Sequence, residues 1–226
     1  MARDDTRPVV GLIGGTGPAG QGVALRLAAA GCTVVIGSRE ASRGAEVADE
    51  LLAAWPDRDL DLRGVANEDA CAADLVVMAA PWEPALKLAA AFAERLAGRI
   101  VISMANALAR VDGNFLPLTM PRGSVCEELQ ARLPQSPVVG AFHHLPAKRL
   151  AQLDHELGCE VLVCGGEQAA RDTVIDLVSA VEGLRGIDAG TLDSAGAIEA
   201  MTAVLVQVNV RYRTHTMLRL VGDFDQ

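Results

Sequence analysis

Six residues near the N-terminus have the spacing of a phosphate-binding turn. Gly15-Thr16-Gly17-Pro18-Ala19-Gly20 fits the pattern GxGxxG and directly follows the apolar run from Val9 to Ile13. In such a turn the first glycine permits a tight bend, the second lets the backbone approach a pyrophosphate, and the third lets the next helix pack on the strand. The helix N-terminus offers free N–H groups and a partial positive charge to phosphate oxygens. The turn therefore predicts dinucleotide binding; the alternative is a plain strand-to-helix turn.

A second group of residues bears on which dinucleotide is bound. Enzymes that use NAD place a carboxylate about 20 residues after the glycines, where it accepts a hydrogen bond from the ribose 2′-hydroxyl. Here the second β-branched run ends in Gly37-Ser38-Arg39, and Arg43 follows, so that the two guanidinium groups share one face of a helix. Guanidinium suits bidentate phosphate contacts. Ser38, Arg39 and Arg43 therefore predict a 2′-phosphate pocket and NADP; the alternative is two arginines on a solvated surface, and Glu40 between them weakens the pocket.

Residues that follow three later apolar runs are candidates for the second-substrate pocket. The run from Leu75 to Ala80 ends at Pro81-Trp82, the next ends at Asn106, and a third ends at His143. The carboxyl ends of parallel strands share one edge of the sheet, where doubly wound folds bind their ligands. Trp82 fits a wall for the nicotinamide ring and also fits the core, and His143 fits both a pocket lining and simple packing.

The adjacent histidines do not predict a metal site. On a strand His143 and His144 would point to opposite faces, so they could not chelate one ion together. No carboxylate or cysteine with zinc spacing accompanies them. The chain contains no GxSxG, P-loop or SxxK element, which leaves hydrolase and kinase chemistry without support and assigns no catalytic nucleophile.

Short apolar runs alternate with helical segments along most of the chain. Strands are expected at residues 9–13, 33–36, 62–65, 75–80, 100–103 and 138–142, and helices at 20–30, 40–54, 85–96 and 124–133, with a loop through Gly113 and Pro117. Fully apolar short strands separated by helices are typical of a parallel sheet covered on both faces. The predicted fold class is therefore α/β, with a doubly wound Rossmann-type domain over residues 1–146 that binds NADP.

A smaller C-terminal α/β part is predicted over residues 147–226, where it would shape the second-substrate pocket and a dimer interface. It contains expected strands at 160–163 and 184–188, a helix at 167–181 and a long helix from about 194 to 220. The boundary near Pro146 is soft, because the strand near Val161 could extend the same sheet. The apolar stretch from Ala197 to Val210 favours burial at a dimer interface or against the active site.

Composition excludes several partners. A formal charge of −9 argues against nucleic acid, since neutralising phosphates requires clustered Lys and Arg. The polar N-terminus lacks the features of an export signal, and no apolar run reaches the roughly 18 residues of a membrane span. The chain has 5 cysteines, an odd number, and none of them forms a CxxC pair. This is expected for buried thiols in a reducing cytoplasm.

Several motifs together resemble the NADPH-dependent reductases of coenzyme F420, a deazaflavin. The early ones are Gly14–Gly17, Gly37–Arg39, Asn67–Ala70, Pro81–Glu83 and His143-x-x-Pro146-Ala147, and the late ones are Val163–Gly165 and Gly183-Leu184-Arg185-x-x-Asp188-Ala189-Gly190. The resemblance implies reversible hydride transfer between deazaflavin C5 and nicotinamide C4 in a homodimer. It implies a pyrophosphate site at Thr16, Gly17, Pro18 and Ala19, a 2′-phosphate site at Ser38, Arg39 and Arg43, and a nicotinamide side flanked by Trp82, Asn106 and Ala147.

Direct hydride transfer needs no protein nucleophile, because the protein supplies orientation and excludes water. A chain with an NADP site and no catalytic dyad is therefore predicted to be an NADP-dependent oxidoreductase with F420 as co-substrate. Two alternatives stay open. One is a non-catalytic NADP(H) sensor without an open second pocket, and the other is an NADPH reductase of a flavin, an imine or ferric iron.

Overall fold

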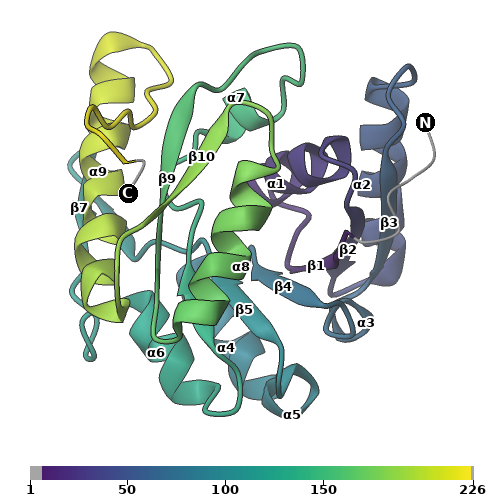
Figure 1. Ribbon diagram of the computed structural model, residues 1–226, viewed down its shortest axis with the longest axis horizontal. Helices are drawn as coiled ribbons and strands as arrows, with labels where there is room; N and C mark the ends of the chain where they lie inside the picture. Colours follow the sequence, from purple (N-terminus) through teal and green to yellow (C-terminus); the bar gives the residue numbers. More distant parts are fainter. Residues whose placement is uncertain (1–6, 225–226) are drawn as a thin grey trace.

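The computed structural model describes residues 7–224. A mixed β-sheet with helices on both faces forms its centre (Figure 1). In this part of the chain the strands lie in the order β10-β9-β8-β5-β4-β1-β2-β3. Their bounds are β1 (Val9–Ile13), β2 (Thr33–Ser38), β3 (Asp61–Ala66), β4 (Leu75–Met78), β5 (Ile100–Ser103), β8 (Val138–Gly140), β9 (Cys159–Gly165) and β10 (Leu184–Asp188). Only the β8–β9 pairing among these is antiparallel.

Alternate residues of the central strands belong to two separate core clusters, one on each face of the sheet. In β4, Leu75 and Val77 pack in the first cluster, whereas Val76 and Met78 pack in the second. The first cluster takes side chains from α1 (Pro18–Ala29), α2 (Ala41–Ala54), α7 (Ala147–Leu150) and α8 (Gln168–Ser179). The second takes them from α3 (Asn67–Ala70), α4 (Trp82–Ala91), α5 (Ala93–Leu96), α6 (Val125–Arg132) and α9 (Ala195–Tyr212). The predicted doubly wound α/β class is confirmed.

Residues on both sides of Pro146 contribute to this one sheet, because β9 pairs with β8 and β10 pairs with β9. The extension of the sheet through Val161, which the sequence leaves open, is the arrangement found. The assignment of residues 1–146 and 147–226 to two functional parts stays a prediction.

Apart from small shifts of element ends, three expected elements differ from the structure. The loop through Gly113 and Pro117 is a hairpin of β6 (Leu108–Val111) and β7 (Asn114–Pro117), and its Asp112-Gly113 turn has positive φ at both residues, as a two-residue hairpin requires. The helix expected at 85–96 begins at Trp82 and divides at Phe92 into α4 and α5.

The third difference is the terminal helix, which ends at Tyr212, not near residue 220. Arg213 adopts a left-handed conformation with φ 50°, and the Asn209 side chain accepts hydrogen bonds from the backbone N and the hydroxyl of Thr216. These bonds hold the chain in a turn at the helix end. In Figure 1, α9 stands beside β7 at one side of the molecule, far from α2 and β3.

A buried arginine joins the first helix to the segment after Pro146. Arg26 of α1 donates hydrogen bonds to the carbonyl oxygens of Arg149, Leu150, Gln152 and His155 at distances of 2.5–3.2 Å. Its exposed fraction is 4%. Guanidinium has five donors in a fixed fork, so one side chain can satisfy several carbonyls of an irregular segment.

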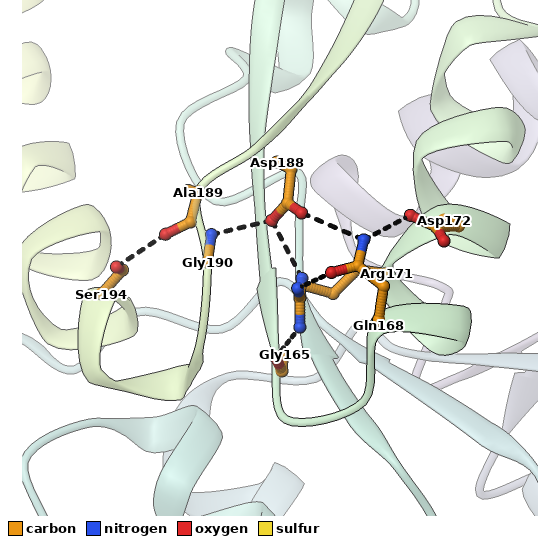
Figure 2. Close-up of polar contacts among 8 residues, drawn as sticks. All are labelled: Gly165, Gln168, Arg171, Asp172, Asp188, Ala189, Gly190 and Ser194. Atoms are coloured by element: carbon orange, nitrogen blue, oxygen red, sulfur yellow. Dashed lines mark hydrogen bonds and ion pairs between the residues drawn. The ribbon is translucent and has the colours of Figure 1, made fainter.

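A second arginine contacts both late motifs, which end at Gly165 and Gly190 (Figure 2). Arg171 of α8 donates to Gly165 O at 2.7 Å and to Asp188 Oδ1 at 2.9 Å, and it also contacts Gln168. The same carboxylate accepts the Gly190 N–H at 2.8 Å. These contacts join the ends of β9 and β10 to α8, so the late motifs serve the packing of this edge of the sheet.

Candidate functional site

The glycine turn lies at the carboxyl end of β1, where the strand order changes direction between β1 and β4. Gly15 N donates to Gly37 O at 3.0 Å and Gly14 N donates to Asn67 Oδ1 at 2.9 Å. A Cβ on Gly20 would lie 2.6 Å from Gly15 O, so helix and turn are in direct contact there. This is the crevice in which doubly wound sheets bind ligands.

Gly17 differs from these glycines because packing does not require it. A Cβ at this position would meet no protein atom within 4 Å, and its φ of −77° is accessible to any residue. Gly17 is the N-cap residue of α1, so the backbone here is bare at the positive end of a helix. Backbone without a side chain at a helix N-terminus permits a close approach by an anionic ligand.

A cavity of about 850 Å³ opens beside this turn. That volume is within the range of small-molecule sites. Its wall includes six residues that the sequence predicts for the cofactor, namely Thr16, Gly17, Ser38, Arg39, Arg43 and Pro81. The glycine turn, the end of β2 and the beginnings of α2 and α4 thus meet at one site.

Both predicted arginines line the cavity, and their surroundings differ. Arg39 and Arg43 are exposed, whereas Ser38 is buried. Arg43 forms ion pairs with Glu46 at 3.0 Å and Glu50 at 3.7 Å. Part of the Arg43 charge is therefore neutralised on its own helix. Glu40 adds a carboxylate to the cavity wall, as expected from the sequence.

The position of α2, which carries Arg43, depends on a close contact with β3. A Cβ on Gly64 of β3 would lie 1.9 Å from the backbone carbon of Gly44. A side chain at position 64 would therefore clash with the backbone of α2, and glycine, which has no Cβ, permits this close approach. The contact sets how near α2, and with it Arg43, lies to the sheet.

The cavity wall also contains residues outside the set of predicted cofactor-binding residues. Asn67 is buried and its side chain accepts the Gly14 N–H, which holds the glycine turn in place. The other additions are Gly14, Glu40, Ala79, Ala80, Pro84, Lys87 and Leu88. Asn67 is the first residue of the Asn67–Ala70 motif. Its contact with the glycine turn joins residues 53 positions apart, so no local sequence pattern predicts it.

Eight predicted residues lie outside this wall. Gly15, Pro18, Ala19 and Gly20 form the turn and the first residues of α1, and Trp82 begins α4 and packs against the second core cluster. The remaining three are Asn106, His143 and Ala147. Their role at a nicotinamide site stays a prediction.

These last three residues have defined surroundings after β5 and β8. Asn106 Nδ2 donates to the carbonyl of His143 at 2.9 Å, and the Thr202 hydroxyl donates to the same oxygen at 3.3 Å. Ala147 begins α7, which packs against α1, and its carbonyl oxygen would lie 3.4 Å from a Cβ on Gly22. The segment after β8 therefore lies beside the helix that follows the glycine turn.

His143 and His144 follow a strand that is shorter than expected. β8 ends at Gly140 and Phe142 has φ 62°, so the histidines lie in a turn, and the argument from strand alternation does not apply. Burial, and then the neighbouring His144, lower the pKa of His143 to about 3. The imidazole is neutral at ordinary pH and is unsuited to act as a general base near pH 7.

An acid and a thiol accompany His143, contrary to the sequence analysis, which expects neither. The ligand-capable atoms of Cys126, His143 and Glu199 lie within 4.8 Å of one another, and all three residues are buried. The carboxylate of Glu199 accepts the N–H groups of Val125 at 2.9 Å and Cys126 at 3.1 Å. Glu199 thus satisfies the first N–H groups of α6 from another helix, a role that explains its burial.

Comparison with known proteins places this architecture in a family. Residues 9–107 match the family model described as NADP oxidoreductase coenzyme F420-dependent. The chain is 36% identical to the F420-dependent NADP reductase of Methanocaldococcus jannaschii, over 91% of this chain and 94% of that protein. It is 30% identical to the protein of the same name from Methanothermobacter thermautotrophicus, over 90% of each.

A solved structure agrees with these relatives along nearly the whole chain. The crystal structure described as a putative F420-dependent NADP-reductase from Arthrobacter sp. FB24 superposes with a TM-score of 0.79 and 26% identity, covering 95% of this chain and 99% of that one. The fold is therefore shared over nearly the full length of both chains. The chain belongs to the family of F420-dependent NADP reductases.

Proposed function

We propose that this protein is an NADP-dependent oxidoreductase that transfers a hydride reversibly between NADP(H) and coenzyme F420. The observation that carries the proposal is the cleft at the end of β1, in which Gly17, Ser38 and Arg39 line one cavity. The family relationship names both substrates, since the relatives are F420-dependent NADP reductases. The residues of the cleft supply the reason that NADP(H) fits.

The dinucleotide is assigned to this cleft by charge and shape. The bare backbone at Gly17 and the start of α1 would hold the pyrophosphate, together with Gly15, Thr16, Pro18, Ala19 and Gly20. Ser38, Arg39 and Arg43 would hold the 2′-phosphate. Pro81, Trp82, Asn106, His143 and Ala147 would flank the nicotinamide, where a buried neutral imidazole and small side chains exclude water.

The chemistry itself belongs to the two substrates, since the reduced nicotinamide supplies a hydride and the deazaflavin accepts it. The protein orients the rings and keeps water out. The contacts of Asn106 and Thr202 with the His143 carbonyl would hold the backbone at His143 in one position. A rigid wall favours the short approach that hydride transfer requires.

Isotope labelling tests the reaction. NADPH deuterated at C4 is mixed with oxidised F420, and we expect the absorbance of the oxidised deazaflavin to fall and the label to appear at its C5. Loss of the label to water would contradict direct transfer. Tight NADPH binding without F420 reduction would favour the sensor, and reduction of a flavin, an imine or ferric iron instead would favour a reductase of another acceptor.

We also propose that the protein works as a homodimer, through the face formed by α9 and the β6–β7 hairpin. Large apolar side chains are exposed there, with Val204 and Val210 each 60% exposed and Tyr212 71% exposed. A hollow of about 700 Å³ lies between the hairpin and α9. An exposed apolar face of this kind is suited to a second copy of the chain, because α9 begins in the core and its apolar surface continues outward.

Sedimentation of a charged variant tests the dimer. The double change Val204→Glu and Val210→Glu would place four carboxylates in a two-fold interface, and we expect it to shift the protein from dimer to monomer. Val221→Glu, at a residue that is 97% exposed and belongs to neither α9 nor the hairpin, is the control and should leave the mass unchanged. A monomeric wild type would contradict the proposal.

The free thiols support a reducing cytoplasmic location for this enzyme. All five cysteines are unpaired and buried, and unpaired thiols are usual in that compartment. Separately, none of the helices in the described residues 7–224 is long and apolar enough to cross a membrane.

A further inference from the structure

We propose that Lys87 is a further specificity-determining residue, whose ammonium group joins Arg39 in holding the 2′-phosphate of NADP(H). The inference rests on the proposed function, because it assigns part of the same cofactor site. Sequence spacing gives no reason to connect the two residues, since they lie 48 positions apart. The structure places both on the wall of one cavity.

Lys87 reaches the cavity from α4, whereas the arginines come from the end of β2 and from α2. Pro84, Lys87 and Leu88 are spaced by three and four residues, so they share one face of α4. All three line the cavity. The cavity thus takes its cations from separate parts of the fold, namely the end of β2, α2 and α4.

The charge requirement of the ligand favours this role. A phosphate monoester carries about −1.5 to −2 charges at pH 7. The cations on the cavity wall are Arg39, Arg43 and Lys87, and Glu40 adds a negative charge. Because Arg43 is paired with two glutamates, Arg39 alone would leave the phosphate incompletely neutralised.

Lys87 is available for this contact. Within the described residues 7–224 no carboxylate is within ion-pair distance of its ammonium group, and its side chain is exposed. The lysine stem can lie along the apolar surface of Pro84 and Leu88 while its charged end reaches outward. An adenine ring on that apolar surface would carry its ribose phosphate towards the cation.

The expected contribution is smaller than that of an arginine, because an ammonium is a flexible, strongly hydrated point charge without a fixed fork. Exposed ion pairs contribute about 0.2–1 kcal/mol, which corresponds to a change in affinity of up to about fivefold. Salt should weaken it further. At about 1 M salt the screening length is about 3 Å and little of the effect should remain.

Calorimetric titration with NADP⁺ and with NAD⁺, without F420, tests this assignment. Lys87→Met keeps the length of the stem and removes the charge, and we expect the Kd for NADP⁺ to rise about three- to fivefold at low salt while the Kd for NAD⁺ changes less than about twofold. Lys87→Arg should retain most of the affinity. The control is Lys148→Met, because Lys148 is the other lysine of the chain and lies outside the cavity wall.

Two results would overturn the inference while the proposed function stands. One is an unchanged Kd for NADP⁺ in Lys87→Met, and the other is an equal loss for both nucleotides, which would place Lys87 at the shared adenosine. A wild type that binds neither nucleotide would overturn the inference and the proposed function together. An equal loss in Lys148→Met would show a general charge effect and would also overturn the inference.

Discussion

Replacing Arg39 by alanine is expected to raise the KM for NADPH by about 10- to 100-fold and to leave the KM for NADH within about twofold. A hydrogen bond to a charged group contributes about 1.5–3 kcal/mol, and each 1.4 kcal/mol corresponds to about tenfold in affinity. Arg39 lines the cleft and, unlike Arg43, has no carboxylate partner within the described residues. Steady-state kinetics with F420 and either nucleotide measure the effect.

Arg43→Ala removes the second arginine of the same site, and its effect can be compared with that of Arg39→Ala. We expect a smaller rise in the KM for NADPH, because the Arg43 guanidinium already pairs with Glu46 and Glu50. Arg219→Ala is the control, since this exposed arginine lines a separate cavity beside β9 and β10 at the far edge of the sheet. Equal wild-type kinetics with NADPH and NADH would exclude the 2′-phosphate pocket.

Replacing Arg26 by methionine is expected to lower the free energy of unfolding by about 3–5 kcal/mol. Four backbone carbonyls accept hydrogen bonds from this guanidinium, and each acceptor left buried without a partner costs about 1–3 kcal/mol. Some of that cost would be relieved as water enters or the segment moves. Small domains are stable by only about 5–15 kcal/mol, so the loss should be plain in urea denaturation.

Arg58→Met is the matched control for Arg26→Met. Arg58 also binds the segment after Pro146, through Asp154 at 3.0 Å, but this pair is exposed. An exposed ion pair contributes about 0–1 kcal/mol, so the control should unfold at nearly the wild-type urea concentration. Equal losses in the two variants would mean that the carbonyl contacts of Arg26 add nothing beyond a surface charge. Arg26→Lys should give an intermediate loss, because an ammonium cannot reach all four oxygens.

Local pattern was sufficient for the central fold and for the position of the glycine turn. Fully apolar short runs separated by helices can be buried only in a sheet covered on both faces. The glycines at 15 and 20 are required by contacts within one turn, so their spacing is visible in the sequence. Ser38 is the last residue of β2 and Arg39 follows it directly, so the strand sets their place at the sheet edge.

Element ends were less predictable, because they depend on single residues and their partners. Phe142 adopts a positive φ and ends the run before the histidines, although its apolar character favours a longer strand. The Asp112-Gly113 turn is a hairpin signal that the sequence does contain. In the segments that flank this turn, apolar and polar residues alternate too weakly to be recognised as strands.

Only the tertiary structure decided which distant side chains complete the cleft. Asn67 holds the glycine turn across 53 residues, and Lys87 lines the same cavity as the arginines from another helix. Elsewhere in the fold, Glu199 accepts the first N–H groups of α6 across 73 and 74 residues. Periodicity and steric limits act over a few residues and are therefore legible in the sequence. Contacts between helices depend on how each packs on the shared sheet, and that arrangement exists only once the whole chain has folded.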